Sequence, residues 1–103
     1  MSKYNSRITY VDGIKFHSVK EAHRYSELLL AVTAGEIKDL QLQVPYKITV
    51  NGMLICDYFA DFVYYDYRFS KVIVEDTKGM RTTVYKLKKK LMKACHDIDI
   101  FET

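Results

Sequence analysis

The sequence is poor in residues that interrupt a chain or cross-link it. Its 103 residues include one proline, four glycines and two cysteines. Cys56 and Cys95 are far apart and form no C-x-x-C pair. They are therefore expected to be small core residues of a protein in a reducing compartment. The three histidines, His17, His23 and His96, lack the spacing of zinc ligands, which argues against a zinc site.

The sequence also lacks a long hydrophobic run. No apolar stretch approaches the ~20 residues that a membrane-spanning helix needs, and the first residues are polar. We therefore expect a cytoplasmic protein without a membrane partner. A length of 103 residues, 49% of them hydrophobic, is typical of one folded domain with a core of its own.

Two residue pairs predict tight β-hairpins, because Asp-Gly and Asn-Gly favour type I′ turns between antiparallel strands. Asp12-Gly13 joins residues 7–11 to residues 14–16, and Asn51-Gly52 joins residues 46–50 to residues 53–59.

Two segments have the period of amphipathic helices. The first begins at Ser18 and ends near Gly35, a residue suited to the positive φ that follows a helix. Its apolar residues fall in one arc about 120° wide. They are Ala22, Tyr25, Leu28, Leu29 and Val32. The second helix is expected over residues 83–96. Its predicted apolar stripe is Val84, Leu87, Leu91, Ala94 and Cys95.

Between the helices, the pattern predicts an antiparallel meander over about residues 37–78. Leucine, glutamine and valine alternate over residues 40–44, as in a half-buried strand. Residues 98–101 indicate a short final strand. The predicted order is an N-terminal β-hairpin followed by α-β-β-β-α-β. This is an α+β or mixed α/β fold, with a mixed sheet flanked by helices.

Two aspartates are predicted to lie opposite each other on neighbouring strands. The midpoint between Asp61 and Asp76 falls between Arg68 and Phe69, inside a predicted turn, so a hairpin would pair the two acids. Two carboxylates in that arrangement are oxygen ligands for a hard divalent cation. Lys78 lies two residues beyond Asp76 and on the same strand face. A carboxylate followed by an ammonium group at the end of an apolar face is costly unless it has a use.

Each of these residues also has a simpler interpretation. Asp61 could be a strand-end aspartate paired with a lysine or with water, although the apolar residues around it argue against an exposed turn. Lys78 could mark the end of a strand, with Gly79 supplying the turn. Glu75 alternates to the opposite face from Asp76 and is expected to meet solvent or a basic neighbour.

Glu21 has two interpretations that do not exclude each other. Ser18 and Glu21 have the spacing of a capping box, in which the glutamate reaches back to the Ser18 amide. Glu21 also lies inside the apolar arc of its helix, between Leu28 and Tyr25, which points it at the sheet and at the two aspartates. Gln43 is either an ordinary solvent-facing strand residue or an auxiliary amide that orients a water or a ligand near the acids.

Positive charge gathers in one part of the chain, although the net formal charge is only +3. Six lysines and one arginine fall between Lys78 and Lys93, and no acidic residue follows before Asp97. This asymmetry predicts a polyanionic partner, with an ordinary solvated lysine face as the alternative. Lys88 lies nearer the apolar stripe than the other lysines and is expected to behave differently. The candidate DNA-binding residues are Arg81, Lys86, Lys88, Lys89, Lys90 and Lys93.

These residues together resemble the PD-(D/E)xK nuclease superfamily, in particular small phage and prophage proteins related to Holliday-junction resolvases. The similarity covers nearly all of the chain, in order. Its motifs are Val11 to Phe16, Ser18-x-x-Glu21-Ala22-x-Arg24-Tyr25, Gly35-Glu36-Ile37, Leu42-Gln43, Ala60-Asp61-Phe62, Glu75-Asp76-Thr77-Lys78-Gly79 and Tyr85-Lys86-Leu87-Lys88. Ala60 stands where the superfamily's eponymous motif has proline, a departure that leaves the metal ligand intact.

The resemblance implies a restriction-endonuclease-like fold over residues 1–103 and a Mg²⁺-dependent endonuclease, for which Mn²⁺ may substitute. It implies that Asp61 and Asp76 bind Mg²⁺, that Glu21 completes the acidic cluster, and that the Thr77 carbonyl is a further metal ligand. Lys78 would orient or help to deprotonate the attacking water and stabilise charge on the phosphorane.

The resemblance also implies a biological setting. The expected enzyme cuts DNA, in particular branched DNA, as a homodimer in phage recombination or DNA processing inside an infected or lysogenic bacterium. Two other functions remain open: a non-catalytic DNA-binding module that keeps the fold, and an RNA-directed nuclease. The intact set of Glu21, Asp61, Asp76 and Lys78 argues against the first. Nothing in the sequence separates deoxyribose from ribose.

Overall fold

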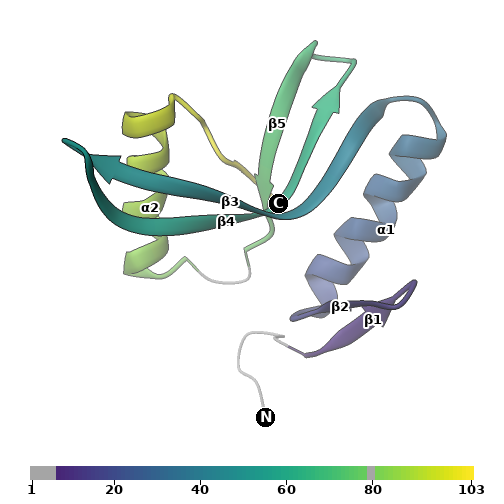
Figure 1. The fold of residues 1–103 in the computed structure, drawn as a ribbon. Coiled ribbons are helices and arrows are strands. Elements are labelled where there is room, and N and C mark those ends of the chain that lie inside the picture. The colour runs from purple at the N-terminus through teal and green to yellow at the C-terminus, as the bar shows by residue number, and fades with distance from the viewer. Residues whose placement is uncertain (1–6, 79–80) are drawn as a thin grey trace.

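Six strands and two helices follow the predicted order in the computed structural model, which describes residues 7–78 and 81–103. The chain begins with the hairpin of β1 (Thr9–Val11) and β2 (Ile14–Phe16) and continues into α1 (Val19–Thr33). The meander consists of β3 (Ile37–Val50), β4 (Met53–Asp66) and β5 (Lys71–Asp76), and α2 (Thr83–His96) leads to β6 (Phe101–Glu102). The α+β class is therefore confirmed (Figure 1).

The main sheet is mixed. Its strand order is β3-β4-β5-β6, in which the first three strands are antiparallel and β6 pairs with β5 in parallel. A parallel neighbour requires a crossover connection, which α2 supplies. β1 and β2 form a separate two-stranded sheet beside α1 (Figure 1).

Both predicted hairpin turns have the left-handed backbone that their sequences favour. The angle φ is 51° at Asp12 and 78° at Gly13, and it is 51° at Asn51 and 79° at Gly52. Positive φ at both central residues is the mark of a type I′ turn, and its twist matches that of the flanking strands.

The helix bounds agree with the capping signals. The Ser18 side chain accepts a hydrogen bond from the Glu21 amide at 3.0 Å, and the Thr82 side chain accepts one from the Tyr85 amide at 3.1 Å. Gly35, just past the end of α1, has φ 76°. Each helix thus begins at a side-chain cap; α1 ends next to a glycine with positive φ, and α2 ends at Asp97, whose φ is 55°.

The apolar arc predicted for α1 is largely correct. Ala22, Tyr25 and Leu28 are buried, whereas Val32 lies near the open end of the helix and is 39% exposed. No helix in the described parts of the chain is long and apolar enough to cross a membrane.

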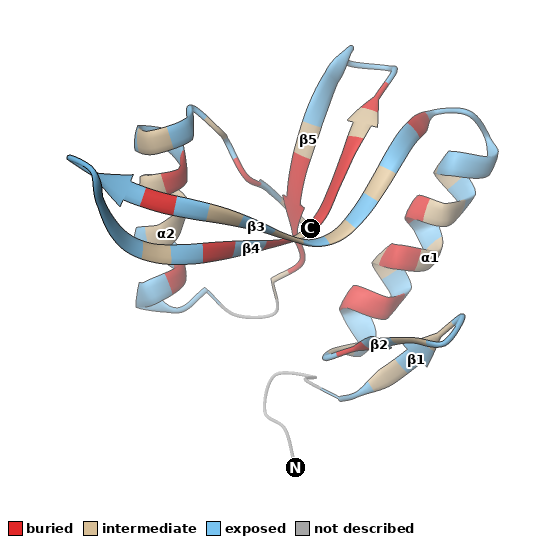
Figure 2. Cartoon of the chain, in the orientation of Figure 1, coloured by how far each residue is buried: buried red, intermediate tan, exposed pale blue. Residues whose placement is uncertain are grey.

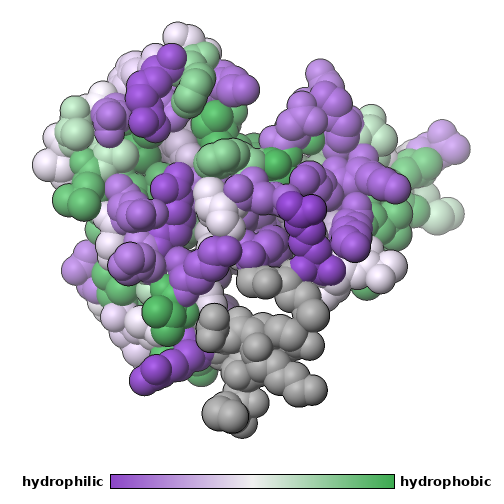
Figure 3. Space-filling view, turned by 180° about the vertical axis from the view of Figure 1, so that it is seen from behind, coloured by the Kyte–Doolittle hydropathy of each residue, from purple (hydrophilic) through white to green (hydrophobic). Residues whose placement is uncertain are grey.

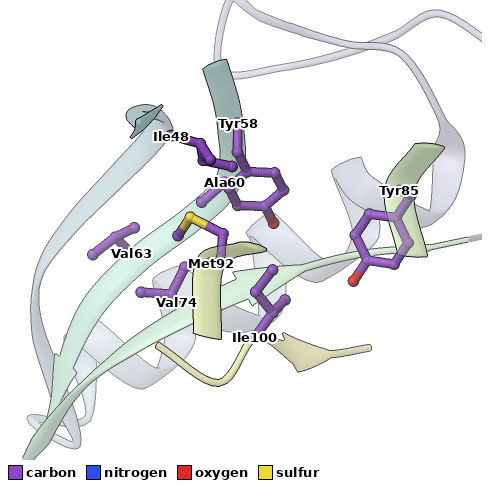
Figure 4. Packing of buried hydrophobic residues seen from close by; sticks show 8 residues of the cluster. All are labelled: Ile48, Tyr58, Ala60, Val63, Val74, Tyr85, Met92 and Ile100. Atoms are coloured by element: carbon purple, nitrogen blue, oxygen red, sulfur yellow. The ribbon is translucent and has the colours of Figure 1, made fainter. Parts of the chain in front are cut away.

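The stripe predicted for α2 is wrong at several positions. Val84 and Leu87 are 62% and 57% exposed, and Ala94 is exposed as well. The buried residues are instead Tyr85 and Met92, which lie two turns apart on one side of the helix (Figure 4). An apolar pattern misses Tyr85 because its ring packs in the core while its hydroxyl keeps a hydrogen bond.

Two hydrophobic clusters form the core, one beside each helix, and Figure 2 shows buried positions on both helices and along the strands between them. The buried residues of the α2 cluster, drawn in Figure 4, are Ile48, Tyr58, Ala60, Val63, Val74, Tyr85, Met92 and Ile100. The buried residues of the α1 cluster are Phe16, Ala22, Tyr25, Leu28, Ile37, Phe62 and Tyr64. Cys56 and Cys95 are free thiols partly buried against the α2 cluster, as expected.

The long hairpin of β3 and β4, which we call the ribbon, joins the two clusters and changes sides along its length. On β3, Leu42 packs against the α1 cluster and Val44 against the α2 cluster. On β4, Ala60 belongs to the α2 cluster and Phe62 to the α1 cluster. In a flat ribbon these residues would share one face and one neighbour, so the strands must twist strongly between them.

Candidate functional site

Asp61 and Asp76 face each other where β4 and β5 meet near the middle of the molecule. Phe62 pairs with Glu75 in the antiparallel register, so the two aspartates are the next residues along the two strands. The Thr77 amide donates to Asp61 Oδ2 at 2.9 Å, which holds this carboxylate against the end of β5. The predicted placement of the aspartates on neighbouring strands is therefore confirmed.

Asp76 is fully buried but only partly hydrogen-bonded. The Tyr58 hydroxyl donates to Asp76 Oδ2 at 2.5 Å, and Lys78 Nζ lies 3.1 Å from Oδ1. The ammonium is close enough for an ion pair, yet Oδ1 has no aligned hydrogen-bond donor among the residues that the structure describes. A buried carboxylate oxygen in this state is costly and is a natural ligand for a cation.

Gln43 connects Asp61 to Glu21. Its Nε2 lies 3.1 Å from Asp61 Oδ1 and 3.5 Å from Glu21 Oε1. The backbone of Gln43 has φ 50°, an uncommon conformation for this residue type, at the point where the ribbon changes sides. Gln43 is exposed, as a solvent-facing strand residue would be, and its amide also lies beside the acids.

Glu21 combines a capping position with a place among the acids. The Ser18 hydroxyl accepts from the Glu21 amide, which is half of a capping box. The carboxylate points at Gln43 instead of returning to the Ser18 amide, and the residue is 9% exposed. Glu21, Asp61 and Asp76, which we call the acidic cluster, therefore come from α1, β4 and β5.

Two members of the acidic cluster have raised pKa values. Burial, followed by the neighbouring Asp76 and Glu21, raises the pKa of Asp61 to about 8, although the Thr77 amide acts in the opposite direction. Burial also raises the pKa of Glu21. Asp76 raises it further, whereas His17 and Lys78 lower it. Crowded acids of this kind are typical of sites that hold a cation or transfer a proton.

The acidic cluster has the donor chemistry of a site for a hard divalent cation, because all its ligand atoms are carboxylate oxygens and one of them has no donor. Within residues 7–78 and 81–103, no group of three or more His, Cys, Asp or Glu side chains already lies close enough together to hold a metal ion. The fit therefore rests on the Asp61–Asp76 pair, and Glu21 would have to move closer to become a third ligand.

Glu75 points to the other side of the sheet and is fully buried there. Its carboxylate accepts from Arg24 Nε at 2.6 Å and Nη2 at 3.0 Å, from the Tyr64 hydroxyl at 2.6 Å and from Thr103 Oγ1 at 3.1 Å. Of its two expected surroundings, solvent is wrong and a basic neighbour is right. The Glu75 carboxylate raises the pKa of Arg24, as a paired anion should.

The predicted DNA-binding residues do not form one free basic face. Glu102 pairs with Arg81 at 2.5 Å and with Lys89 at 3.2 Å. Lys93 pairs with Asp97 at 2.9 Å. Three of the six candidate cations are therefore partly neutralised within the chain.

The other three lysines of α2 fall into two groups. Lys88 Nζ donates to the Asp57 carbonyl on β4 at 2.9 Å, in keeping with the expectation that it differs from the rest. Lys86 and Lys90 are one helical turn apart and have no acidic partner in the described parts of the chain. Like charges at this spacing repel each other, and a bound anion would relieve the repulsion.

A hollow of about 390 Å³ lies between α2 and the segment that leads into β6. Its basic lining residues are Arg81, Lys86, Lys89, Lys90 and Lys93, and its acidic ones are Asp99 and Glu102. The excess of three positive charges equals the net formal charge of the whole chain. Hydrophilic side chains cover much of this side of the molecule (Figure 3). We call this feature the basic hollow.

Three residues near the acidic cluster were not identified from the sequence. They are Tyr58, Lys20 and Tyr85. Lys20 Nζ donates to the Lys78 carbonyl at 3.0 Å, and the ring centroid of Tyr85 lies 4.4 Å from Lys78 Nζ. Lys20 had a signal, since it precedes Glu21 in the first turn of α1. The sequence gives no signal for the two tyrosines, because whether their side chains meet the acidic cluster depends on the twist of the sheet. Tyr85 also lines the basic hollow, which therefore adjoins the acidic cluster.

The fold and the site define an α+β protein with a mixed sheet and a buried acidic cluster beside a basic hollow. The chain belongs to the family described as "Protein of unknown function (DUF1064)", whose model matches residues 1–99. No curated protein and no solved structure matches the chain.

Proposed function

We propose that this protein is a divalent-cation-dependent endonuclease that hydrolyses phosphodiester bonds in DNA, with branched DNA as its preferred substrate. The observation that carries the proposal is the buried Asp76 Oδ1, which has no aligned hydrogen-bond donor among the residues that the structure describes. It lies on the strand next to Asp61, and the Lys78 ammonium is 3.1 Å away. Phosphodiester hydrolysis needs this combination of metal ligands and a fixed positive group at the reacting phosphate.

The proposed fold is restriction-endonuclease-like, and the proposed superfamily is PD-(D/E)xK. The order α1-β3-β4-β5-α2-β6, with β6 parallel to β5, supports this assignment. The position of the aspartates on two neighbouring strands supports it as well. This step is an analogy of fold and motif, whereas the role of the acidic cluster is argued from its own contacts.

In this proposal, Asp61 and Asp76 hold the cation and Glu21 completes its ligand set. When bound, Mg²⁺ or Mn²⁺ would neutralise phosphate charge and make a nearby water more acidic. Tyr58 donates to one oxygen of Asp76 and so directs the other oxygen toward the cation. Gln43 bridges Asp61 and Glu21 and keeps the two acids in register.

Lys78 supplies the fixed positive charge. Its carbonyl is bound by the Lys20 ammonium, and its own ammonium lies over the Tyr85 ring. A cation held in place in this way stabilises the negative charge that develops on the phosphate, at no cost of reorganisation, and it can orient the attacking water.

The basic hollow supports DNA as the substrate. Helical lysines and arginines that line a groove bind the phosphate backbone without reading sequence. Lys86 and Lys90 are the candidates for direct contact, because the other helix cations have acidic partners or a carbonyl partner. One acidic cluster per chain and two strands per duplex favour a homodimer.

The experiment is a cleavage assay on a panel of linear, nicked, flap and four-way-junction DNA with Mg²⁺ or Mn²⁺. The wild type is expected to cut at least one of these substrates, and Asp61→Asn to cut none while it keeps its circular-dichroism spectrum and its affinity for DNA. Asp39→Asn is the matched control. Asp39 is an exposed β3 acid outside the cluster, and asparagine tolerates its positive φ.

Two outcomes would count against the proposal. Full activity of Asp61→Asn would remove the acidic cluster from the reaction. Tight DNA binding by the wild type with no cleavage under any metal condition would identify a binding module that keeps the fold. Cleavage of RNA but not DNA would retain the chemistry and change the substrate.

A further inference from the structure

One face of the ribbon is exposed although much of it is apolar. The cross-strand pairs on this outer ribbon face are Pro45–Phe59, Lys47–Asp57 and Thr49–Leu54, and all six residues are exposed (Figure 2). The pairs that alternate with them, Tyr46–Tyr58 and Ile48–Cys56, face the α2 cluster.

The apolar residues of the outer ribbon face carry a large exposed surface. Phe59 is 55% exposed and Leu54 is 53% exposed. Ile55, at the irregular point in the pairing of β3 with β4, is 51% exposed. These exposed apolar residues lie on either side of the charged Lys47–Asp57 pair. Exposed apolar surface beside polar residues is typical of an interaction surface.

The shape of the molecule is consistent with a missing neighbour. Its radius of gyration is 14.5 Å, and its principal extents are 41 × 40 × 19 Å. A compact chain of this length has a radius of gyration of about 13 Å. The excess reflects the ribbon, which extends away from β5 and α1 with its outer face uncovered (Figure 1).

We propose that the outer ribbon face binds the same face of a second copy of this chain. A two-fold axis along the ribbon places Lys47 opposite Asp57 of the second copy and Phe59 opposite Pro45 of the second copy. Within the described parts of the chain, neither Lys47 nor Asp57 has an ion-pair partner for its side chain. The face is therefore complementary to itself in both charge and apolar contact.

The other route to a paired ribbon, through the edge of β3, is hindered. β3 is the edge strand of the main sheet, but Pro45 has no amide hydrogen to donate. Asp39 and Gln43 have φ 55° and 50°, which breaks the regular row of backbone groups along the same edge. Such features hinder edge-to-edge pairing along β3.

The pairing has a consequence for the candidate site. Gln43 and Asp61 continue the outer ribbon face toward the middle of the molecule, so an axis along the ribbon brings both acidic clusters to the same end of the dimer. The idea that the two acidic clusters cut the two strands of a DNA duplex rests on the proposed function. The pairing itself does not, because it is measured without metal or DNA.

The test is sedimentation equilibrium of the metal-free protein over a range of concentrations, with charge-reversed variants. The wild type is expected to approach twice the 12.1 kDa chain mass. Lys47→Asp and Asp57→Lys should each be monomeric, since each places like charges across the two-fold axis. An equimolar mixture of the two should dimerise again, because opposite charges then face each other. Lys15→Asp, an exposed strand lysine outside the ribbon, is the matched control and should dimerise like the wild type.

A second pair of variants tests the apolar part of the face. Phe59→Ser should weaken dimerisation by more than about tenfold, as truncation of a central aromatic does. Phe69→Ser, which alters a phenylalanine that is 65% exposed between β4 and β5, should leave dimerisation unchanged. A wild type that stays monomeric at every concentration overturns the proposal, as does a dimer that none of the ribbon variants disturbs. Monomeric protein whose DNA affinity falls in Phe59→Ser would assign the face to nucleic acid and would also overturn it.

Discussion

Glu75 and Asp76 are consecutive acids on β5, and both are fully buried, but the fold surrounds them in opposite ways. Glu75 receives four hydrogen bonds that reach both of its oxygens, from donors on α1, on β4 and at the end of the chain. Asp76 receives one hydrogen bond on one oxygen, and its other oxygen faces an ammonium without an aligned bond. The first arrangement satisfies a buried charge, and the second leaves one partly unsatisfied.

Under the proposed function, the difference separates a structural acid from one that binds a cation. Burial alone does not distinguish them, because both side chains are 0% exposed. Completeness of hydrogen bonding does, since a protein gains nothing in stability from a buried oxygen without a donor. Glu75 is explained by the fold, whereas under the proposed function a bound cation would explain the incompletely bonded oxygen of Asp76.

The largest expected effect is on catalysis, and of the two consecutive acids it should fall on Asp76. Asp76→Asn removes a metal-ligating charge and should lower the cleavage rate by roughly 10²–10³-fold or more. Its free energy of unfolding should stay the same or rise, because a buried charge is lost. Single-turnover cleavage and urea denaturation measure the two quantities. Wild-type turnover, or a marked loss of stability, would place Asp76 with Glu75 as a structural acid.

The next largest effect is on stability, and it should fall on the Glu75 side. Arg24→Ala leaves the Glu75 carboxylate buried without its cation and should lower the free energy of unfolding by about 3–5 kcal/mol. Arg81→Ala is the control: Arg81 is exposed and Glu102 keeps Lys89 and Tyr85 as partners, so the loss should be no more than about 1 kcal/mol. Equal losses in the two variants, measured by thermal and urea unfolding, would contradict the structural role of Glu75.

A smaller effect on stability sharpens the comparison at Glu21, which has both a capping and a cluster position. In Glu21→Gln the backbone amide of residue 21 still donates its hydrogen bond to the Ser18 hydroxyl. The free energy of unfolding should therefore fall by only about 0.5–1 kcal/mol. Cleavage should nevertheless be lost, because the third carboxylate is gone. Ser18→Ala provides the reverse control, with lower stability and retained cleavage. An active Glu21→Gln variant would mean that Glu21 has only a capping role in α1.

The smallest effect concerns the basic hollow. Lys86→Ala combined with Lys90→Ala should reduce the slope of log affinity against log salt by about 0.9 per lost phosphate contact, or about two in total. Binding is measured in Ca²⁺, which we expect to occupy the site without supporting cleavage, over a salt series. Lys15→Ala combined with Lys71→Ala is a control for loss of charge elsewhere. A slope equal to that of the wild type would mean that Lys86 and Lys90 are only solvated.

Local chemistry made the elements of this fold predictable. The bounds of α1 follow from Ser18 and Gly35, the start of α2 follows from Thr82, and the two hairpins follow from their Asp-Gly and Asn-Gly pairs. These signals involve residues a few positions apart, so they act before any tertiary contact forms. The register that pairs Asp61 with Asp76 was predictable for the same reason, because one short turn sets it.

Tertiary contacts decided what the sequence did not reveal. The partner of Glu75 is Arg24, on a different element and far away along the chain, so the choice between solvent and a basic neighbour stayed open. The buried face of α2 was misassigned because Tyr85 packs its ring in the core while its hydroxyl bonds to Glu102. The amide of Gln43 meets the acids only because the ribbon twists at that position.

The change of sides along the ribbon gives the acidic cluster a mechanical role. The two halves of the core are linked by β3 and β4, and the link turns over at Gln43 and Asp61, so any torsion of the ribbon alters the distance between the acids. A cation clamped between the carboxylates would resist that torsion. Backbone amides of β3 and β4 far from the metal should then exchange their hydrogens with solvent more slowly. The stiffness of the whole molecule would then be set at the acidic cluster.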